Sequence, residues 1–525
     1  MIFVQFHHFQ TRLSADLAKL WDGINWSLAE KELYKQQCKI AAAVQCKADD
    51  LVQETQKELV NSYEARILAV RHVSSTSNSH GPDGARWKKA HQKMRAAIEL
   101  NNDNYRAGPS RLVVIQPKKG KERNIKLSNL SDRAMQTLYS YALAPVAETL
   151  GDKKSFAFRQ YRSGNDAHHY IIKTFSGKDA PEYLVKADVK SHYESICHRW
   201  LLHNIPMDKH ILAKFLNAGF IFDGELFPSI EYGISIGGNI SPILANMTLD
   251  GLQTAIYMGL YGHGPIDFDN GNMVRFADDI VVAARTQEDA SKIMYIISRF
   301  LRVRGLSLSR VKSKIHKVSH GFEFLSRYYQ KIEGMMYAQP SANAVARFEE
   351  MLTEFISGYK GSQQSLIEEL NKKLNGWAGY HKFADAQDAF RHIDVVVNTL
   401  LLALCESKYK RMNLEIIISR YFFPTADGEY VYAMKDKKNV RVARLSKVPL
   451  VVHRPLSLSR NPFLEPQYFR DLARERAMSN ITGKYKAIWA RHNGLCFYCG
   501  NPILPDQLKS VTNTENDPDK ESISC

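Results

Sequence analysis

The chain of 525 residues lacks the features of membrane-spanning and secreted proteins. It contains no run of about 18 apolar residues, the length that a transmembrane helix needs. Its start, Met1–Leu13, has neither a charged leader nor a small-residue cleavage site, so we expect no secretory signal. Only seven cysteines occur, an odd number, which disfavours a disulfide framework. We therefore expect a protein of a reducing compartment, the bacterial cytoplasm or an organelle, with no membrane partner.

Internal repeats and low-complexity tracts are also absent, and the composition is that of a globular protein. Apolar residues make up 44% and aromatic residues 10% of the chain, and its length predicts three or four packed units. The 71 lysines and arginines exceed the 55 acidic residues and give a net charge of +16. Such a surplus indicates a polyanionic partner, most simply nucleic acid. The alternative is a basic protein without such a partner.

The residue pattern changes along the chain from helical to mixed and back to helical. Apolar residues recur at helical spacing from about residue 20 to residue 73, and again over residues 341–412. Between them lie short apolar runs bounded by turn residues, which predict strands. These runs are Arg111–Gln116, Glu122–Leu127, Glu182–Val189, Met273–Ala284 and Phe322–Leu325. A long helix is expected from Asp132, and the whole pattern predicts an α+β fold.

Two adjacent aspartates, Asp278 and Asp279, stand between the apolar runs Met273–Phe276 and Ile280–Ala284. The pattern predicts a tight hairpin, in which neighbouring side chains point to opposite faces. Adjacent half-buried acids are costly unless a cation compensates them, so a metal site is one interpretation. The other is an ordinary hairpin with an acidic turn, because aspartate is common in turns.

A third aspartate, Asp188, ends another apolar strand, and the aromatic Tyr193 follows five residues later. Phosphoryl transfer by two metal ions needs carboxylates that bridge ions about 3.5–4 Å apart. One strand end and one hairpin tip can supply these carboxylates. We therefore expect Asp188, Asp278 and Asp279 to form one catalytic site.

Several segments resemble motifs of the reverse transcriptase–maturases that group II introns encode. Phe276–Asp279 is similar to the family's aromatic-Ala-Asp-Asp hairpin, and Gly237–Asn246 to its Gly-Gly-x-Ile-Ser-Pro-Leu-Leu-Ala-Asn segment. The resemblance implies a right-hand polymerase, with fingers and an antiparallel palm sheet followed by a helical thumb. Further similar segments are Asp132–Gln136, Ser155–Arg162, Leu308–Ser313 and Gly321–Leu325.

By this resemblance, Asp188 and Asp278 bind two Mg²⁺ ions, and Asp279 supports the ions or the primer end. The backbone carbonyl of Val189 completes the shell of one ion. Tyr193 stands where the family has the aromatic residue that excludes a 2′-hydroxyl group. The alternative for Tyr193 is a tyrosine of the core.

The resemblance also implies a nucleotide site. Lys118 and Arg123 lie on the predicted finger hairpin and would clamp the triphosphate, since lysine and arginine suit phosphate oxygens. Lys312 would approach the leaving pyrophosphate, while Ile236 and Gly237 would line the pocket. The alternatives are a solvated basic turn for Lys118 and Arg123 and an ordinary surface lysine for Lys312.

The sequence departs from the family pattern in four segments around that nucleotide site. Ser235 and Ile236 replace a Pro-Gln pair, and isoleucine cannot hydrogen-bond to a nucleotide as glutamine would, although Asn239 could partly substitute. The segment after Arg123 reads Asn-Ile-Lys-Leu-Ser instead of Pro-Leu-Gly-Ile-Pro. A glycine is replaced by Ala157 and a tyrosine by Phe276. The alternative function is therefore a polymerase-deficient maturase that only binds intron RNA.

The C-terminal part resembles the remaining domains of the family. Leu374–His381 is similar to the maturase signature, and we expect Trp377 to pack in the core while Lys372 and Lys373 contact RNA. The basic segment Lys408–Arg460, with interleaved aromatic residues, suits DNA binding.

Cys496 and Cys499 resemble the opening of an HNH nuclease. A zinc site needs four ligands, and the second cysteine pair and the histidine pair are absent from the sequence. We therefore expect a truncated nuclease remnant, with residual zinc binding as an alternative, and regard a homing endonuclease as the weakest of three candidate functions.

The predicted function is that of an RNA-directed DNA polymerase which also binds intron RNA to promote splicing and mobility. Its expected partners are template and intron RNA, primer and target DNA, and deoxynucleoside triphosphates. The predicted domains are an N-terminal helical extension (1–100), fingers and palm (101–335), a helical thumb and maturase domain (336–412), a DNA-binding segment (413–485) and the nuclease remnant (486–525).

Overall fold

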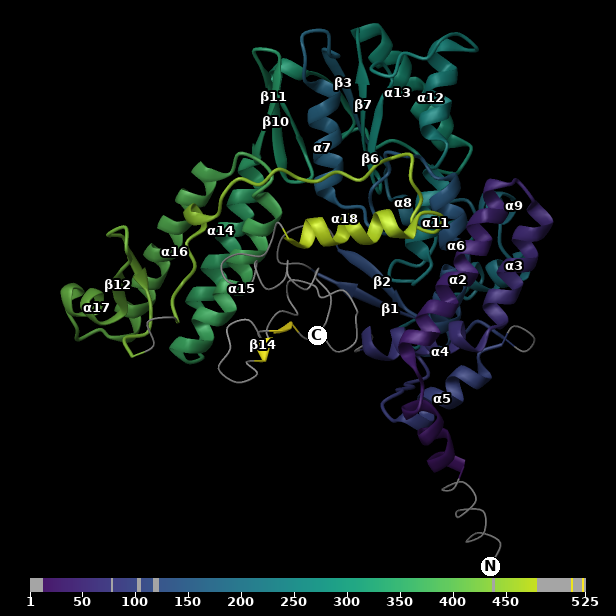
Figure 1. The fold of residues 1–525 in the computed structure, drawn as a ribbon, viewed down its shortest axis with the longest axis horizontal. Coiled ribbons are helices and arrows are strands. Elements are labelled where there is room, and N and C mark those ends of the chain that lie inside the picture. The colour runs from purple at the N-terminus through teal and green to yellow at the C-terminus, as the bar shows by residue number, and fades with distance from the viewer. Residues whose placement is uncertain are drawn as a thin grey trace, which may run out of the picture. The chain divides into compact units, whose positions relative to one another are not determined.

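The computed structural model describes residues 13–76, 79–101, 105–116, 122–436 and 440–478, together with two short strands near the C-terminus. Contacts between residues divide the chain into two compact units, and the chain passes from one unit to the other several times (Figure 1). The first unit contains the residues up to Ser163, Val185–Ile315 and Leu456–Asp471. The second contains Gly164–Leu184, His316–Pro455 and the residues from Leu472 onward. The predicted domain boundaries stay predictions.

The first unit begins with helices that pack against the long helix α6 (Leu130–Leu150), as the apolar spacing predicts. Helix α2 starts where the side chain of Asn25 accepts a hydrogen bond from the backbone N–H of Leu28 at 3.1 Å. Its buried residues include Leu33 and Ile40, on the face that meets α3, α4 and α6. The helices of this group are α2 (Trp26–Gln45), α3 (Asp49–Asn61), α4 (Tyr63–Thr76) and α5 (Ala90–Glu99).

A four-stranded sheet with the order β2-β1-β4-β5 follows. The predicted hairpin is confirmed: β1 (Ser110–Ile115) pairs antiparallel with β2 (Arg123–Leu127). Strand β4 (Phe220–Phe222) adds parallel to β1, and β5 (Glu225–Phe227) pairs antiparallel with β4. The sequence did not predict β4 and β5, because three residues are too few to show an alternating pattern.

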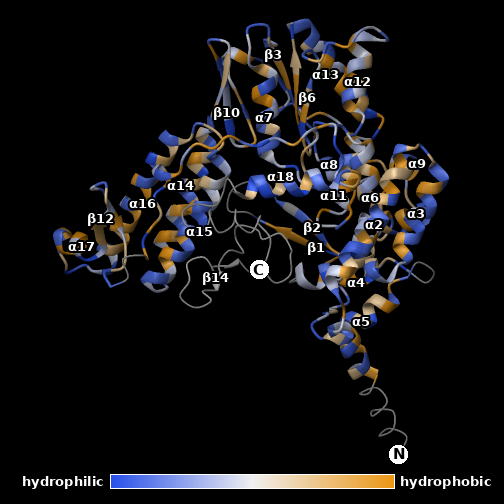
Figure 2. Ribbon diagram, viewed as in Figure 1, coloured by the Kyte–Doolittle hydropathy of each residue, from blue (hydrophilic) through white to orange (hydrophobic). Residues whose placement is uncertain are grey.

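A second sheet of four strands has the order β6-β7-β3-β8. Strand β7 (Asp279–Ala284) is buried from Ile280 onward, because helix α13 (Gln287–Arg302) covers it. Strands β6 and β7 of this sheet are rich in hydrophobic residues, whereas hydrophobic and hydrophilic residues alternate along helices such as α13 (Figure 2). The other strands are β3 (Tyr183–Asp188), β6 (Met273–Phe276) and β8 (Lys314–Lys317). Strand β8 was not predicted, because the lysines at both of its ends interrupt the apolar pattern that is typical of a strand.

Five further helices of the first unit connect these sheets. They are α8 (His192–Ser195), α9 (His198–Asn204), α10 (Lys209–Leu216), α11 (Ser241–Leu249) and α12 (Leu252–Tyr261). Helix α12 packs against α13, and α11 contacts α6 and α8. Helix α11 therefore lies next to the segment that follows β3, where the first predicted site residue is found.

The second unit combines a small sheet with the predicted helical region. The sheet has the order β11-β10-β9, and the residues between 341 and 412 form three helices, as expected. Buried residues of these helices form one apolar cluster. The elements are α7 (Gly164–Phe175), η1 (Val318–His320), β9 (Phe322–Phe324), β10 (Arg327–Ile332), β11 (Met335–Pro340), α14 (Ala342–Ser357), α15 (Gln363–His381), α16 (Gln387–Lys408), α17 (Leu414–Tyr421), β12 (Phe422–Pro424), β13 (Tyr430–Tyr432) and η2 (Leu445–Lys447).

Helix α18 (Pro466–Met478) and the pair β14 (Val511–Thr512) and β15 (Ser522–Ile523) complete the elements. Together the helices and sheets confirm the α+β class. Among the described helices, none combines the length and the hydropathy that crossing a membrane requires.

Candidate active site

Asp188 is held at the end of β3 by the segment that precedes β8. Its backbone N–H donates to Ser313 Oγ at 3.1 Å, and its carbonyl accepts from the N–H of Ser309 at 2.8 Å. Its side chain accepts a hydrogen bond from Lys312 Nζ at 2.9 Å. Asp188 is only 6% exposed, and burying its negative charge is unfavourable. The positive charge of Lys312 is therefore an important compensation for it. One segment thus fixes both the backbone and the charge of Asp188.

Val189 continues this pairing and forms an isolated antiparallel bridge with Leu308. The hydrogen bonds that flank the bridge belong to Asp188 and Lys190, whose N–H donates to Ser307 at 2.9 Å. In an antiparallel pair of this type, the carbonyl of the bridged residue points away from its partner. The carbonyl of Val189 is therefore turned away from Leu308, the orientation that a metal ligand would need.

Asp278 and Asp279 lie at the tip of the β6–β7 hairpin. Phe276 pairs with Asp279, so Ala277 and Asp278 form a two-residue turn. Ala277 has a φ of 56°, as the first central residue of a type II′ turn requires. Glycine is the usual residue at that place, and the positive φ of an alanine costs conformational energy. The turn leaves both aspartates half-buried.

The three carboxylates are close enough to perturb one another. Burial raises the pKa of Asp279 to about 6, and the negative charges of Asp278 and Asp188 add to the effect. Burial also raises the pKa of Asp278, again with a contribution from Asp188. The hydrogen bond to Asp188 raises the pKa of Lys312. Three acids thus share one place, and negative charge is in excess there.

A divalent cation would relieve this excess. Within the described ranges, no three His, Cys, Asp or Glu side chains are grouped tightly enough to form a ready-made metal site. Mg²⁺, however, is commonly held by one or two carboxylates, with waters and substrate phosphates as its other ligands. The carboxylates of Asp188 and Asp278 and the carbonyl of Val189 fit that type of site.

Tyr193 lies near this hairpin, one turn beyond Asp188. Burial and the charge of Asp278 raise the pKa of the Tyr193 hydroxyl to about 12. Its carbonyl accepts a hydrogen bond from the N–H of Ile234 at 2.7 Å, and its ring meets that of His192 edge-on at 5.6 Å. Tyr193 is half-buried, so its ring is neither fully in the core nor fully solvated.

The turn that carries Ile236 and Gly237 is hydrogen-bonded to the sheet β2-β1-β4-β5. The N–H of Lys126, in β2, donates to the carbonyl of Ile236 at 3.2 Å. Gly237 has a φ of +96°, and a Cβ at this position would lie 3.3 Å from the side chain of Ile125. Asn239, the suggested substitute for the missing glutamine, donates instead to Thr137 Oγ1 of α6 at 2.7 Å.

Two polar residues near these motifs, Gln136 and Arg275, were not predicted as residues that support the site. A Cβ on Gly238 would lie 2.9 Å from Gln136 Oε1, which is buried and accepts no hydrogen bond from the described residues. Arg275, inside β6, is 0% exposed and donates to Asn246 Oδ1 at 3.3 Å and to the carboxylate of Asp250. The sequence did contain a signal for Arg275: a charged residue within the apolar run Met-Val-Arg-Phe indicates a buried charge that needs a partner.

The segment resembling the family's Gly-Phe-Arg motif has a structural role here. Arg159 and Arg162 each donate to one carboxylate oxygen of Glu148, at 2.7 Å. Burial opposes the charge of Glu148, but the two arginines hold its pKa below the ordinary value. These arginines therefore stabilise α6 and the following loop.

The structure brings Asp188, Asp278, Asp279 and Lys312 into one electrostatic group. Lys118, Cys496 and Cys499 lie outside the described residues, as does the side chain of Arg123. The predicted triphosphate clamp, the zinc site and the nuclease remnant therefore stay predictions.

In the second unit, Trp377 packs as expected. Its ring stacks on Phe348 with centroids 4.6 Å apart and an interplanar angle of 3°, and it packs against the apolar cluster that α14, α15 and α16 form. Lys373 Nζ lies 4.7 Å from the centroid of Phe355. Lys372 is exposed.

Comparison with known families matches three consecutive segments. The N-terminal domain of reverse transcriptase matches residues 21–100, and reverse transcriptase (RNA-dependent DNA polymerase) matches residues 115–328. The group II intron maturase-specific domain matches residues 345–422. The chain belongs to the group II intron reverse transcriptase/maturase family. The reverse transcriptase match of this family member includes all three aspartates, and the maturase match includes Trp377.

Individual relatives of this reverse transcriptase/maturase are distant. Protein YkfC of Escherichia coli is 26% identical over 51% of the chain and 80% of its own length. Maturase-like protein 1 of Euglena gracilis is 21% identical over 69% of the chain and 77% of its own length. The chain spans only 32% of the putative COX1/OXI3 intron 1 protein of Saccharomyces cerevisiae, at 24% identity. A telomerase from Candida albicans, solved with telomeric RNA, matches with a TM-score of 0.35 and 11% identity, over 60% of this chain and 64% of that chain.

Proposed function

We propose that the chain is an RNA-directed DNA polymerase that also binds intron RNA to promote splicing and mobility. The observation that carries the proposal is the shared electrostatic environment of Asp188, Asp278 and Asp279, two of which have raised pKa values. Carboxylates that repel one another at a strand end and a hairpin tip suit divalent cations. The family assignment supplies the class of reaction.

In this proposal, Asp188 and Asp278 hold two Mg²⁺ ions with the carbonyl of Val189, while Asp279 supports them. The bound ions would stabilise the charge of the attacking and leaving oxygens. The primer 3′ oxygen forms a bond to the α-phosphorus of a deoxynucleoside triphosphate, and the bond to pyrophosphate breaks. Lys312, which is 67% exposed and hydrogen-bonded to Asp188, reaches the leaving pyrophosphate as a mobile cation.

Tyr193 would select deoxynucleotides, because it is half-buried and close enough to Asp278 for that charge to raise its pKa. In this proposal the ring of Tyr193 would occupy the space that a 2′-hydroxyl group needs. Lys118 and Arg123 would bind the triphosphate, and Ile236 and Gly237 would line the base or ribose. The net charge of +16 suits the proposed partners, which are template and intron RNA and primer or target DNA.

Primer extension on an RNA template tests the proposal. Asp278→Ala should reduce extension by a factor on the order of 10³ or more, because the variant loses a proposed metal ligand. Removing an essential catalytic group typically has an effect of about this size. Asp269→Ala is the matched control, because Asp269 is an exposed aspartate of the same unit. Equal extension by wild type and the Asp278→Ala protein would refute the assigned site.

A polymerase-deficient maturase is the second candidate, and one observation favours it. Ile236 replaces a hydrogen-bonding glutamine, and Asn239 is already bonded to Thr137. If the wild type does not extend primers, Ile236→Gln tests whether the pocket is the cause. Intron splicing that persists in the Asp188→Ala protein, together with no extension by the wild type, would favour this candidate.

A further inference from the structure

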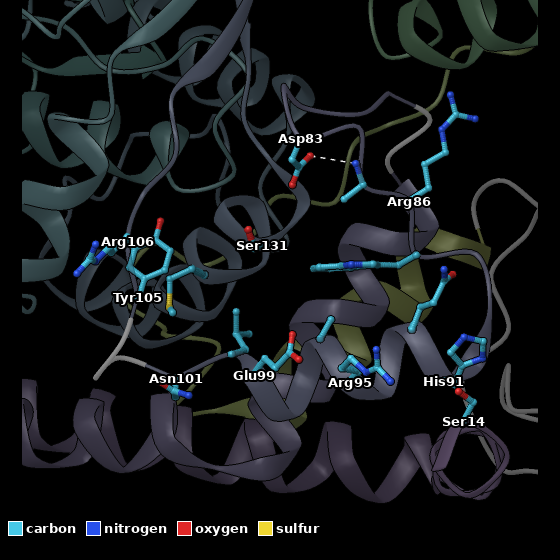
Figure 3. Close-up of a pocket in the computed structure, with 16 residues that line it drawn as sticks. Ser14, Asp83, Arg86, His91, Arg95, Glu99, Asn101, Tyr105, Arg106 and Ser131 are labelled. Carbon is cyan, nitrogen blue, oxygen red and sulfur yellow. Dashed lines mark hydrogen bonds between the residues drawn. The ribbon is translucent and has the colours of Figure 1, made fainter. Parts of the chain in front are cut away.

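The first unit contains a cavity of about 690 Å³, formed by the N-terminal domain and the start of α6 (Figure 3). One wall is α5, from which His91, Arg95 and Glu99 line the space. These three residues are four positions apart, so they lie on one face of the helix. In Figure 3, Arg106 and Tyr105 lie on the side of the hollow opposite His91.

Hydrogen bonds fix each wall of the cavity. Asn129 Oδ1 accepts from the N–H of Asp83 at 3.2 Å, which ties the loop before α5 to the start of α6. Asp132 accepts from the Tyr105 hydroxyl at 2.8 Å and from the N–H of Gly108 at 3.3 Å, which anchors the backbone beside Arg106. The side chain of Gln92 accepts from the N–H of Lys89 at 3.0 Å and begins α5. The cavity is thus preformed, as binding sites commonly are.

The charged residues of the lining suit an anion. Arg86, Arg95 and Arg106 line the cavity, and none of them forms an ion pair with another described residue. Two acids, Asp83 and Glu99, also line the cavity, and Asp83 Oδ1 already accepts from the N–H of Ala85 at 3.0 Å. The fork of guanidinium donors matches the oxygens of a phosphate.

An aromatic residue lies beside these arginines. Trp87 lines the cavity and is half-buried, and no ring or cation of the described residues stacks on it. Tyr105, in contrast, is already engaged: its ring packs edge-on against Phe215 at 5.9 Å. Single-stranded nucleic acid is commonly bound by an aromatic side chain that stacks on a base and by basic side chains that contact phosphates, and this cavity offers both.

We propose that this cavity binds one unpaired nucleotide, with its base stacked on Trp87 and its phosphate between Arg95 and Arg106. A cavity of about 690 Å³ holds a nucleotide but no duplex. The nucleotide belongs either to a single-stranded RNA or to the free pool, and both present the same base and phosphate. The site contains none of the three palm aspartates, so binding does not depend on polymerisation.

Binding of the full-length protein to an RNA octamer with one central 2-aminopurine tests this proposal, because the fluorescence of that base falls when it stacks. Trp87→Leu should weaken binding by about 5- to 150-fold, the range that corresponds to one stacked base. Trp87→Phe should restore most of the affinity. Arg95→Gln and Arg106→Gln should each lower the salt-dependence slope by about 0.7. Arg302→Gln, an exposed arginine of α13, is the matched control.

An octamer that lacks the central base should bind wild type and the Trp87→Leu protein equally. Competition by adenosine 5′-monophosphate that Trp87→Leu abolishes would identify the free nucleotide as the ligand, whereas binding of the octamer alone would identify RNA. The Asp278→Ala protein should bind the octamer as the wild type does, even if primer extension fails. If Trp87→Leu, Arg95→Gln and Arg106→Gln all bind as the Arg302→Gln control does, the proposal is wrong.

Discussion

Arg275 offers a direct test of how the β6–β7 hairpin, which carries Asp278 and Asp279, is held. Its side chain is fully buried in β6 and donates to Asn246 and to the carboxylate of Asp250. Its backbone N–H donates to the carbonyl of Lys154 at 2.9 Å, and its own carbonyl accepts from Phe156 at 2.9 Å. Arg275→Met removes the charge but leaves the backbone bonds and a similar volume. We expect the hairpin tip to lose stability while the global fold persists.

The size of the effect follows from the charge that remains. Removing one partner of a buried ion pair costs about 3–5 kcal/mol, because the other charge stays buried without compensation. The side chain of Asp250 is 16% exposed and still accepts from the N–H of Asp152 at 3.2 Å, so we expect the lower end of this range. A loss of about 3 kcal/mol corresponds to roughly a 150-fold larger open population. Arg275→Met with Asp250→Leu should recover much of that loss.

Hydrogen exchange is the suitable assay, because a chain of two units does not unfold in one step. The amides of β6 and β7 should exchange about 150-fold faster in the Arg275→Met protein and much less so in the double variant. Amides of α14, in the other unit, are the internal control. An increase below fivefold in the single variant, or additive losses in the double variant, would refute the buried ion pair as the support of the hairpin.

Three other predictions concern single residues. Trp377→Leu should destabilise helices α14–α16 by about 2–3 kcal/mol, because stacking on Phe348 and buried area are lost. Hydrogen exchange measures this loss, and an unchanged exchange rate of the α14 amides would contradict the prediction. Burial, with Arg327 adding, lowers the pKa of His168 to about 3. Unfolded His168 binds a proton below about pH 6.5 and the folded residue does not, so stability falls as pH falls from 6.5 towards 3. The loss at pH 5 is about 2 kcal/mol, and His168→Gln should show a smaller drop in Tm between pH 7.5 and 5. Lys312→Met should lower stability by less than about 1 kcal/mol, since the lysine is exposed, but slow extension about 100-fold, with Lys312→Arg intermediate.

Much of the fold could be predicted because the chain's local patterns agree with its tertiary structure. The apolar spacing of α2–α4 and α14–α16 matches the faces that they bury. The β6–β7 hairpin was predictable because two apolar runs flank two polar residues. In contrast, β4 and β5 have only three residues each, and β8 has a lysine at each end, so they form only where a neighbouring strand provides hydrogen-bond partners.

The residue pattern predicted the carboxylates of the candidate site, and the family resemblance added Lys312, but neither predicted the contacts between them. An aspartate at a strand end is visible in a sequence, whereas the contacts of Lys312 and Ser313 with Asp188 join residues 124 and 125 positions apart. The same holds for Arg275, whose partner Asp250 lies 25 positions earlier in the chain, outside the motifs named above. Long-range partners of this kind come from tertiary structure and not from local spacing.

The turn that carries Ile236 and Gly237 shows why a residue-by-residue comparison with the family is insufficient. The sequence suggests that Asn239 could replace the missing glutamine, but its amide is bonded to Thr137. A buried polar atom near this turn that lacks a partner among the described residues is Gln136 Oε1, close to the backbone of Gly238. A buried carbonyl oxygen without a donor costs about 1–3 kcal/mol, so a ligand or water that donates to it would be favoured. Gln136 lies on helix α6, far from Ile236 in the sequence, and only the folded chain brings its free acceptor near the Gly-Gly turn.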